Sequence, residues 1–419
     1  MFFILIYISL VIIRPQEYPA LVEQAPPILP VALVAALIAW AVSARKSFSE
    51  PQYALLFGFF AAVMMSQVAN GWAGGALAQF ALFGPAVATF VLLSHAATTQ
   101  RRVMAAMVTI VLCACLLAVH GVEQVETGIG WTGMPLVQDD GRIQYVGVFS
   151  DPNDLGLLFV SVLPMAFFLS TRGGMLGLAR LFWLAAAALL LYGIYLTNSR
   201  GALLAVAFLV GFWLWLRRGM VTALVVGGAG LTAMTLLPSR LQELDASESS
   251  AAGRIDAWYE GLQMFISQPL FGVGAGNFTE HNYLTAHNSF VLALAETGFV
   301  GFTFWLAFVA YGFRMMLTLY RHKPELSDPD AEQSWKTERA IACTLLLALG
   351  AFCAAAFFLS RTYNTVLYLI AALIVAEYHG ARERFPSLPD FPLGRDLVRI
   401  PLYAIAAIVA MYVLVRVLL

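Results

Sequence analysis

The sequence predicts an all-α polytopic membrane protein, a helical bundle of about 12–13 transmembrane helices with one long, partly helical loop. Hydrophobic residues make up 60% of the 419 residues and charged residues only 12%. Soluble domains contain about 45–50% apolar and about 25% charged residues. Apolar runs of helix length recur along the whole chain, and a bilayer-spanning helix needs roughly 20 such residues. These runs are continuous rather than alternating, which favours helices over a membrane β-barrel.

The predicted spans follow the apolar runs from one end of the chain to the other. They lie at about 1–13, 28–42, 53–69, 76–94, 103–119, 155–170, 181–197, 202–216, 220–237, 288–319, 340–358, 363–378 and 401–419. The first two are short, so the number of spans could be one lower. The first run lacks a basic leader and a small-residue cleavage site, and we expect a retained helix rather than a signal peptide.

Lysine and arginine gather in every second loop between these spans. They are Arg45, Lys46, Arg101, Arg102, Arg172, Arg180, Arg217, Arg218, Arg321, Lys323, Lys336, Arg339, Arg382, Arg384, Arg395 and Arg399. Cytoplasmic loops of membrane proteins carry an excess of these residues. All of them fall on one side if the N-terminus is cytoplasmic, so we predict that orientation.

The opposite loops should then face the periplasm and be poor in arginine. They lie at about 14–27, 120–154, 198–201, 238–287 and 359–362. Four arginines depart from this expectation, namely Arg142, Arg200, Arg254 and Arg361. Topology alone does not account for cations on this side, so they become candidates for binding an anion.

Two of these arginines lie in short motifs. Arg200 belongs to Thr-Asn-Ser-Arg-Gly at 197–201, at the outer end of one helix and the start of the next. Arg254 begins a predicted amphipathic helix after Gly253, which Gln268-Pro269 should end. Each arginine could instead have no role in binding and extend to the lipid headgroups at the membrane interface, as arginine side chains commonly do. Two outward cations together favour a diphosphate, whose charge needs more than one partner.

A third motif, His-Asn-Ser-Phe at 287–290, lies where the long loop meets the next helix. His287 can exchange a proton near neutral pH, and either Asn288 or Ser289 could cap the helix. Glu296 lies about two turns further along. Carboxylates within membrane helices are costly and are usually functional or paired.

The remaining features are weaker. Phe-Ser-Asp-Pro-Asn-Asp at 149–154, which contains Asn153, is typical of a capped helix start. The glycine-rich stretch 272–276 lacks the Lys-Ser/Thr of a P-loop and is interpreted as a flexible turn. Neither the histidines nor the acidic pair Asp139-Asp140 has the spacing of a metal site, so we assign no metal and no cofactor. The formal net charge of −1 gives no reason to expect nucleic acid.

Taken in order, these motifs resemble the O-antigen ligase and O-antigen polymerase superfamily of bacterial membrane glycosyltransferases. The resemblance rests on Phe-x-Asp-Pro-Asn at 149–153, Thr-Asn-Ser-Arg-Gly at 197–201, Gly-Arg-x-x-x-Trp at 253–258, Pro-Leu-Phe-Gly-Val-Gly-x-Gly-Asn-Phe at 269–278, His-Asn-Ser-Phe at 287–290 and Glu-x-Gly at 296–298. It covers about the middle third to half of the chain, whereas the flanking helices match in hydropathy alone.

The resemblance implies an inner-membrane enzyme that uses a glycan on undecaprenyl diphosphate at the periplasmic face, without a metal and with inversion. Arg200 and Arg254 would hold the diphosphate, and His287 would act as general base toward an acceptor hydroxyl. Arg142, Asn153, Asn288, Glu296 and Arg361 would contribute to substrate binding. The acceptor would be another glycan or lipid A core, and membrane lipids would surround the protein. One integral membrane domain would comprise helices at 1–237, a periplasmic catalytic loop at 238–287 and helices at 288–419.

Two other functions remain open at this stage. The same motifs serve polymerases of surface polysaccharide as well as ligases, and the sequence does not separate them. A transporter for a lipid-linked sugar or a small anion is a different class; it would place ionisable residues and broken helices near the membrane midplane. Glu296 and Pro164 fit that alternative, but the outward clustering of arginines favours the transferase. A scaffold of an envelope assembly complex would give these residues no role.

Overall fold

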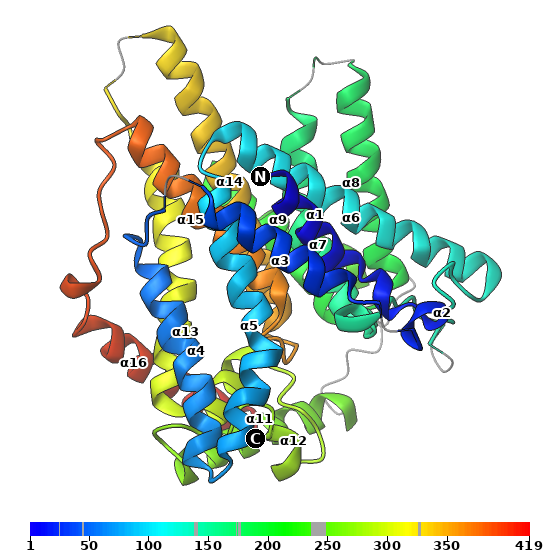
Figure 1. Cartoon of the computed structure of the whole chain (residues 1–419), viewed down its shortest axis with the longest axis vertical. Helices are drawn as coiled ribbons and strands as arrows, with labels where there is room; N and C mark the ends of the chain where they lie inside the picture. The colour runs from blue at the N-terminus through cyan, green and yellow to red at the C-terminus, as the bar shows by residue number, and fades with distance from the viewer. Residues whose placement is uncertain are drawn as a thin grey trace.

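A computed structural model describes residues 1–24, 26–43, 46–137, 141–172, 174, 177–235, 249–325 and 328–419; for 231–235 and 249–252 the backbone alone is described. The molecule is 77% helical and has no β-strand within these ranges (Figure 1). The predicted all-α class is confirmed. Arg45 and the acidic pair at 139–140 lie outside the described residues, as does the part of the long loop before Ser249.

The helices follow one another closely along the chain. They are α1 (Phe2–Ile13), α2 (Pro19–Val22), α3 (Ile28–Ala41), α4 (Pro51–Ala69), α5 (Ala73–Ala96), α6 (Gln100–Thr127), α7 (Pro152–Ser170), α8 (Leu178–Leu196), α9 (Arg200–Arg218), α10 (Met220–Thr235), α11 (Ser249–Ser267), α12 (Phe278–His281), α13 (Ser289–Arg321), α14 (Pro329–Ala356), α15 (Thr365–Arg384) and α16 (Arg399–Leu418). Every predicted span therefore falls on a helix.

Nine of the described helices are long and apolar enough to cross a membrane: α4, α5, α6, α7, α8, α9, α13, α14 and α16. The other four predicted spans fall on α1, α3, α10 and α15. Helices α1 and α3 have 12 and 14 residues, which is short for a bilayer. Helix α15 is buried along nearly its whole length but ends in charged residues. Nine candidate spans agree with a polytopic bundle, and the number of 12–13 stays a prediction.

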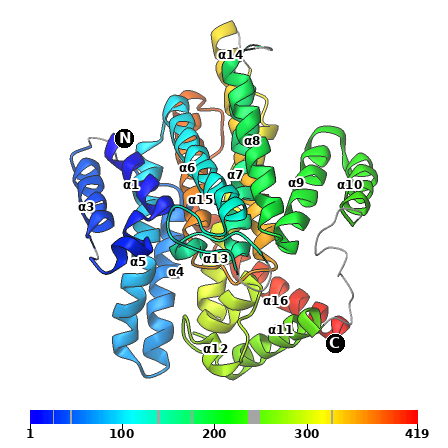
Figure 2. The same cartoon turned by 90° about the vertical axis from the view of Figure 1, so that its right-hand side faces the viewer.

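Helix α7 is the centre of the bundle, because nearly all of its residues are buried between α8 and α14 (Figure 2). Its first turn is fixed by Asp151, whose side chain accepts a hydrogen bond from the backbone N–H of Asn153, and by Pro152. Helix α16 lies at the periphery with most of its side chains exposed, as expected of a helix that faces lipid.

The loops predicted to face the periplasm are joined to one another by hydrogen bonds. The Tyr18 hydroxyl is 2.7 Å from that of Tyr145, and the Arg142 Nε donates to the Thr197 carbonyl at 2.7 Å. The segment 357–364 reaches the long loop through Thr285 and Ser360 at 2.8 Å. These loops therefore share one side of the bundle, as the alternation of charged loops predicts.

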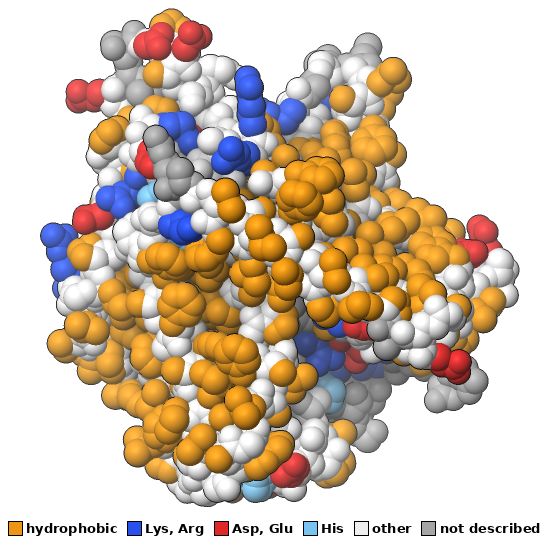
Figure 3. Space-filling view, in the orientation of Figure 1, with side chains coloured by type: hydrophobic (Ala, Val, Ile, Leu, Met, Phe, Trp, Pro, Cys, Tyr) orange, Lys and Arg blue, Asp and Glu red, His pale blue; other side chains and the backbone are white. Residues whose placement is uncertain are grey.

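The arginine-rich loops meet on the other side. The Arg384 Nε donates to Glu338 at 2.6 Å and its Nη1 to the Thr98 carbonyl at 3.0 Å. The Gln100 amide donates to Glu338 at 2.7 Å. Figure 3 shows Lys and Arg side chains gathered toward this end, with broad hydrophobic surfaces below them.

Helix α13 is broken at Gly298, whose φ of 61° and ψ of −164° suit glycine alone. The glycine-rich segment lies against this break. The backbone N–H groups of Val273 and Gly274 donate to the carbonyls of Ala295 and Glu296 at 2.9 and 3.1 Å. The span predicted at 288–319 therefore lies on one helix that is interrupted at Gly298, and the glycine-rich segment, interpreted from the sequence as a flexible turn, packs against that break.

The predicted amphipathic helix is present as α11, which packs against α13 and α16. Trp258 and Leu262 are buried, whereas Asp256 and Glu260 are exposed. The helix begins at Ser249, five residues before the predicted start at Arg254, and ends at Ser267, before Gln268-Pro269 as predicted. Ile266, next to the end of the helix, is 56% exposed although its spacing from Trp258 and Leu262 would put it on the same face.

Candidate functional site

Three of the four outward arginines line one small cavity. Arg142, Arg200 and Arg254 enclose about 70 Å³ together with Asn153. The remaining lining residues come from the start of α9 and from the turn after α14: Asn198, Ser199, Gly201, Phe358 and Leu359. Four chain segments distant in sequence therefore converge on one site. Figure 3 shows a hollow on one face of the molecule where basic, acidic and histidine side chains gather between apolar surfaces.

Arg142 is held by a network at the wall of the cavity. Its Nε donates to the Thr197 carbonyl at 2.7 Å and its Nη2 to the Asn153 Oδ1 at 2.9 Å. Asn153 is fixed in turn by Asp151, which accepts from its backbone N–H at 2.7 Å. A guanidinium held in this way cannot change rotamer freely, so its charge is preorganised toward the cavity.

Arg200 is the first residue of α9, and the turn before it has a special geometry. Asn198 has a φ of 46°, in the left-handed region, and the Ser199 side chain caps the helix by accepting from the Ala202 N–H at 3.3 Å. The positive end of the helix dipole and the Arg200 guanidinium therefore lie together, an arrangement that favours an anion. Arg254 reaches the same cavity from α11.

His287 lies beside this cluster, in the connection between the long loop and α13. Its φ of 46° is also left-handed, a backbone conformation that is costly outside glycine and is frequently found at functional sites. Burial lowers the pKa of His287 below its usual value, the charge of Arg254 lowers it further, and Asp151 raises it in part. The imidazole is therefore held in its neutral form, which can accept a proton.

Arg361 is committed to an acidic partner that the sequence interpretation did not single out. Its Nη2 donates to the Asp154 Oδ2 at 2.6 Å and its Nε to Oδ1 of the same carboxylate, while Asp151 lies 3.8 Å from Nη2. Arg361 also lowers the pKa of His287, so it lies close enough to influence the site. In the sequence, Asp154 was marked only by its place at the end of the motif at 149–154.

Asn288 and Glu296 have structural partners. Asn288 caps α13, because its Oδ1 accepts from the N–H groups of Phe290 and Val291 at 2.9 and 3.1 Å. The buried Glu296 accepts from the Tyr363 hydroxyl at 2.9 Å and from the Phe278 N–H at 3.3 Å. Neither residue lines the arginine cavity, and a contact of either with substrate stays a prediction.

The arrangement can bind and stabilise a polyanion next to a neutral base. Arginine forks match phosphate oxygens and keep their charge at any physiological pH. Of the eight predicted site residues, four line the cavity. Two more lie close enough to act on one another or on the cavity, because the charges of Arg254 and Arg361 both lower the pKa of His287. In the described part of the chain, no group of three or more His, Cys, Asp or Glu side chains could hold a metal ion.

Comparison with known families divides the chain in two. Residues 185–306 match the family described as O-Antigen ligase, and residues 1–174 match a family of unknown function. No curated protein matches the chain. The first match contains Arg200, Arg254 and His287, whereas Arg142 and Asn153 lie in the second. The match over 185–306 supports the assignment of this chain to the O-antigen ligase family, the family that its motifs resemble.

Proposed function

We propose that this protein transfers a glycan from undecaprenyl diphosphate to an acceptor hydroxyl at the periplasmic face of the bacterial inner membrane. The observation that carries the proposal is the convergence of Arg142, Arg200 and Arg254 on one cavity beside His287. The O-antigen ligase match supports a membrane enzyme of this type. The lipid diphosphate, the acceptor and the compartment are parts of the proposal.

Breaking the bond between the sugar and the diphosphate builds negative charge on the leaving oxygen. Arg200 and Arg254 would bind the diphosphate and stabilise this charge, and Arg142 would complete the cationic wall. Fixed charges in a site with little water are worth more than in solution, because they need no reorganisation as the reaction proceeds. Loss of one such donor typically costs on the order of 100- to 1000-fold in rate.

His287 would take the proton from the acceptor hydroxyl as that oxygen attacks the anomeric carbon. Its lowered pKa keeps the imidazole neutral and able to act as a base. The diphosphate, once bound, adds negative charge nearby and favours the protonated product of this step. Attack on the side opposite the leaving group inverts the anomeric centre, and no step requires a metal ion.

Arg361 and Asp154 would act as positioning residues. Arg361 donates its backbone N–H to the Ser289 Oγ at 2.8 Å, and Ser289 donates to the Leu359 carbonyl at 2.6 Å. The ion pair with Asp154 thus fixes the start of α13 and the turn whose Leu359 lines the cavity. It would set the distance between the arginines and His287 without touching the donor.

The test is a transfer assay with purified protein in nanodiscs, a lipid-diphosphate-linked oligosaccharide as donor, and separate glycan and lipid A-core acceptors. His287→Ala, Arg200→Ala and Arg254→Ala should each reduce product by at least about 100-fold at unchanged protein level. Arg217→Ala is the matched control, because Arg217 lies at the other end of α9 and should leave transfer unchanged. A chelator should have no effect.

The acceptor that is used separates the two activities of the superfamily. Product on lipid A core indicates a ligase, and extension of the lipid-linked glycan indicates a polymerase. If all three variants transfer at the wild-type rate, the site assignment is wrong. If wild-type protein forms no product but moves the lipid-linked sugar across a proteoliposome membrane, the transporter alternative replaces the proposal.

A further inference from the structure

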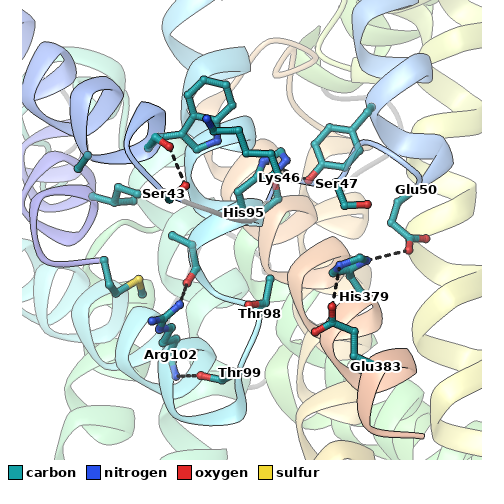
Figure 4. Close-up of a pocket in the computed structure, with 17 residues that line it drawn as sticks. Ser43, Lys46, Ser47, Glu50, His95, Thr98, Thr99, Arg102, His379 and Glu383 are labelled. Atoms are coloured by element: carbon teal, nitrogen blue, oxygen red, sulfur yellow. Dashed lines mark hydrogen bonds and ion pairs between the residues drawn. The ribbon is translucent and has the colours of Figure 1, made fainter. Parts of the chain in front are cut away.

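A second cavity lies among the arginine-rich loops, on the side away from the proposed active site. It encloses about 810 Å³ between α1, α3, the α3–α4 connection, the α5–α6 turn and the end of α15. Helix α6 begins at this cavity and runs for 28 residues, or about 42 Å, before the chain reaches the segment with Arg142. The two cavities therefore belong to different regions of the molecule, and Figure 4 shows the second one.

The wall of this cavity carries two cations, Lys46 and Arg102. The Lys46 Nζ donates to the Ala41 carbonyl at 2.8 Å and lies 4.7 Å from the centre of the Trp40 ring. The Arg102 Nη1 donates to the Ala96 carbonyl at 3.4 Å. Among the residues that the structure describes, neither cation has a carboxylate partner. Both charges are thus available to an anion inside the cavity.

The acidic part of the wall is already balanced. His379 lies between Glu50 and Glu383, at 3.4 and 3.7 Å, as Figure 4 shows. Arg382 adds a second contact to the buried Glu50 at 3.4 Å. Both carboxylates therefore have basic partners of their own, which are neither Lys46 nor Arg102.

The local helix electrostatics point the same way. Arg102 lies in the first turn of α6, which contains no acidic residue, although negative charge is what the start of a helix favours. Thr99 caps this helix at the cavity wall. An anion beside Arg102 would relieve the repulsion between the arginine and the helix dipole.

We propose that this cavity binds the phosphate group of a glycerophospholipid. The apolar lining favours a lipid over free phosphate: Ile4, Ala39 and Trp40 line the cavity from α1 and α3. On the outer side of α3, Val31, Val34 and Ile38 are exposed, so this side of the helix is available to acyl chains. A tryptophan beside a lysine is typical of the headgroup level of a bilayer, and basic pockets between membrane helices suit anionic headgroups.

The test uses the full-length protein in detergent, with binding of short-chain phosphatidylglycerol measured by native mass spectrometry and thermal shift. Inorganic phosphate and a diacylglycerol without phosphate are the comparison ligands. Lys46→Gln and Arg102→Gln should each weaken phosphatidylglycerol binding about fivefold, and together on the order of 25-fold, since each cation near a headgroup contributes about 1 kcal/mol. Diacylglycerol should not bind.

Arg101→Gln is the matched control, because Arg101 is exposed in the same turn but does not line the cavity; it should bind phosphatidylglycerol like wild type. All variants should unfold at the wild-type temperature without lipid, since Lys46 and Arg102 are exposed. If inorganic phosphate binds as tightly as phosphatidylglycerol, and the Lys46 and Arg102 variants weaken its binding, the phosphate site is real but its ligand is soluble rather than a lipid. Equal loss in Arg101→Gln, or no loss in the double variant, would overturn the site.

Discussion

Arg361 and Asp154 form an ion pair that joins the turn after α14 to the first turn of α7. The Nη2 of Arg361 is 2.6 Å from the Asp154 Oδ2, and its Nε donates to the other carboxylate oxygen. The Asp154 side chain is 4% exposed and that of Arg361 is 29% exposed. Two segments that are 207 residues apart are thereby fixed at the wall of the proposed active site.

Asp154→Asn should destabilise the protein by about 2–4 kcal/mol, because it removes the nearer of the two carboxylates that balance a largely buried guanidinium. Denaturant unfolding in detergent measures the loss. Arg361→Gln should cost a similar amount, and the double variant Asp154→Asn/Arg361→Gln should cost clearly less than the sum of the two. Additive losses would show that the two side chains do not stabilise each other.

Glycan transfer should depend on pH through His287. The proposed base must be neutral, and its pKa is lowered, so donor kcat/KM should rise with pH through a value below about 6.5 and then level off. Asp151 raises this pKa, so Asp151→Asn should move the acid limb to lower pH while keeping a capping side chain at α7. A limb that stays in place or moves upward would contradict the role of His287.

Gly298→Ala should destabilise the protein strongly. Its backbone has a φ of 61°, and an added Cβ would lie 2.5 Å from the Leu270 carbonyl. Strain and overpacking together should exceed about 2 kcal/mol, seen as a lower unfolding temperature and less folded protein. Gly211→Ala is the control: nothing lies within 4 Å of the new Cβ, so a helix-favouring alanine should be neutral or slightly stabilising there.

Tyr363→Phe tests what Glu296 does. The variant removes a 2.9 Å hydrogen bond to this buried carboxylate, which should cost about 1–3 kcal/mol of stability. If Glu296 serves to hold the glycine-rich segment, Glu296→Gln should retain transfer per folded molecule and Tyr363→Phe likewise. A large loss of rate in Glu296→Gln with normal unfolding would instead support the predicted contact with substrate.

Hydropathy and the positive-inside rule were sufficient for the helices and for the grouping of loops on two sides, because both depend on local composition. The same rule marked Arg142, Arg200 and Arg254 as exceptions, and the structure brings them to one cavity. Asn288 and Ser289 were both possible caps of α13, and the structure selects Asn288.

Other features depend on contacts that no local pattern contains. The pairing of Asp154 with Arg361 joins distant segments, so the motif at 149–154 could not reveal it. The break at Gly298 was also missed, because a glycine after Glu-Thr does not by itself predict a left-handed backbone. The structure gives its cause: the N–H groups of Phe299 and Val300 donate to the carbonyls of Pro269 and Leu270, and the Leu270 backbone leaves no room for a Cβ at the glycine.

The lining of the arginine cavity has a consequence for substrate range. It presents three guanidinium groups, which match phosphate oxygens rather than any particular sugar. An enzyme that binds its donor through the diphosphate would recognise the lipid carrier, and these contacts would not depend on the sugar sequence. Cells that change the repeat unit of their surface polysaccharide could then keep the same catalyst.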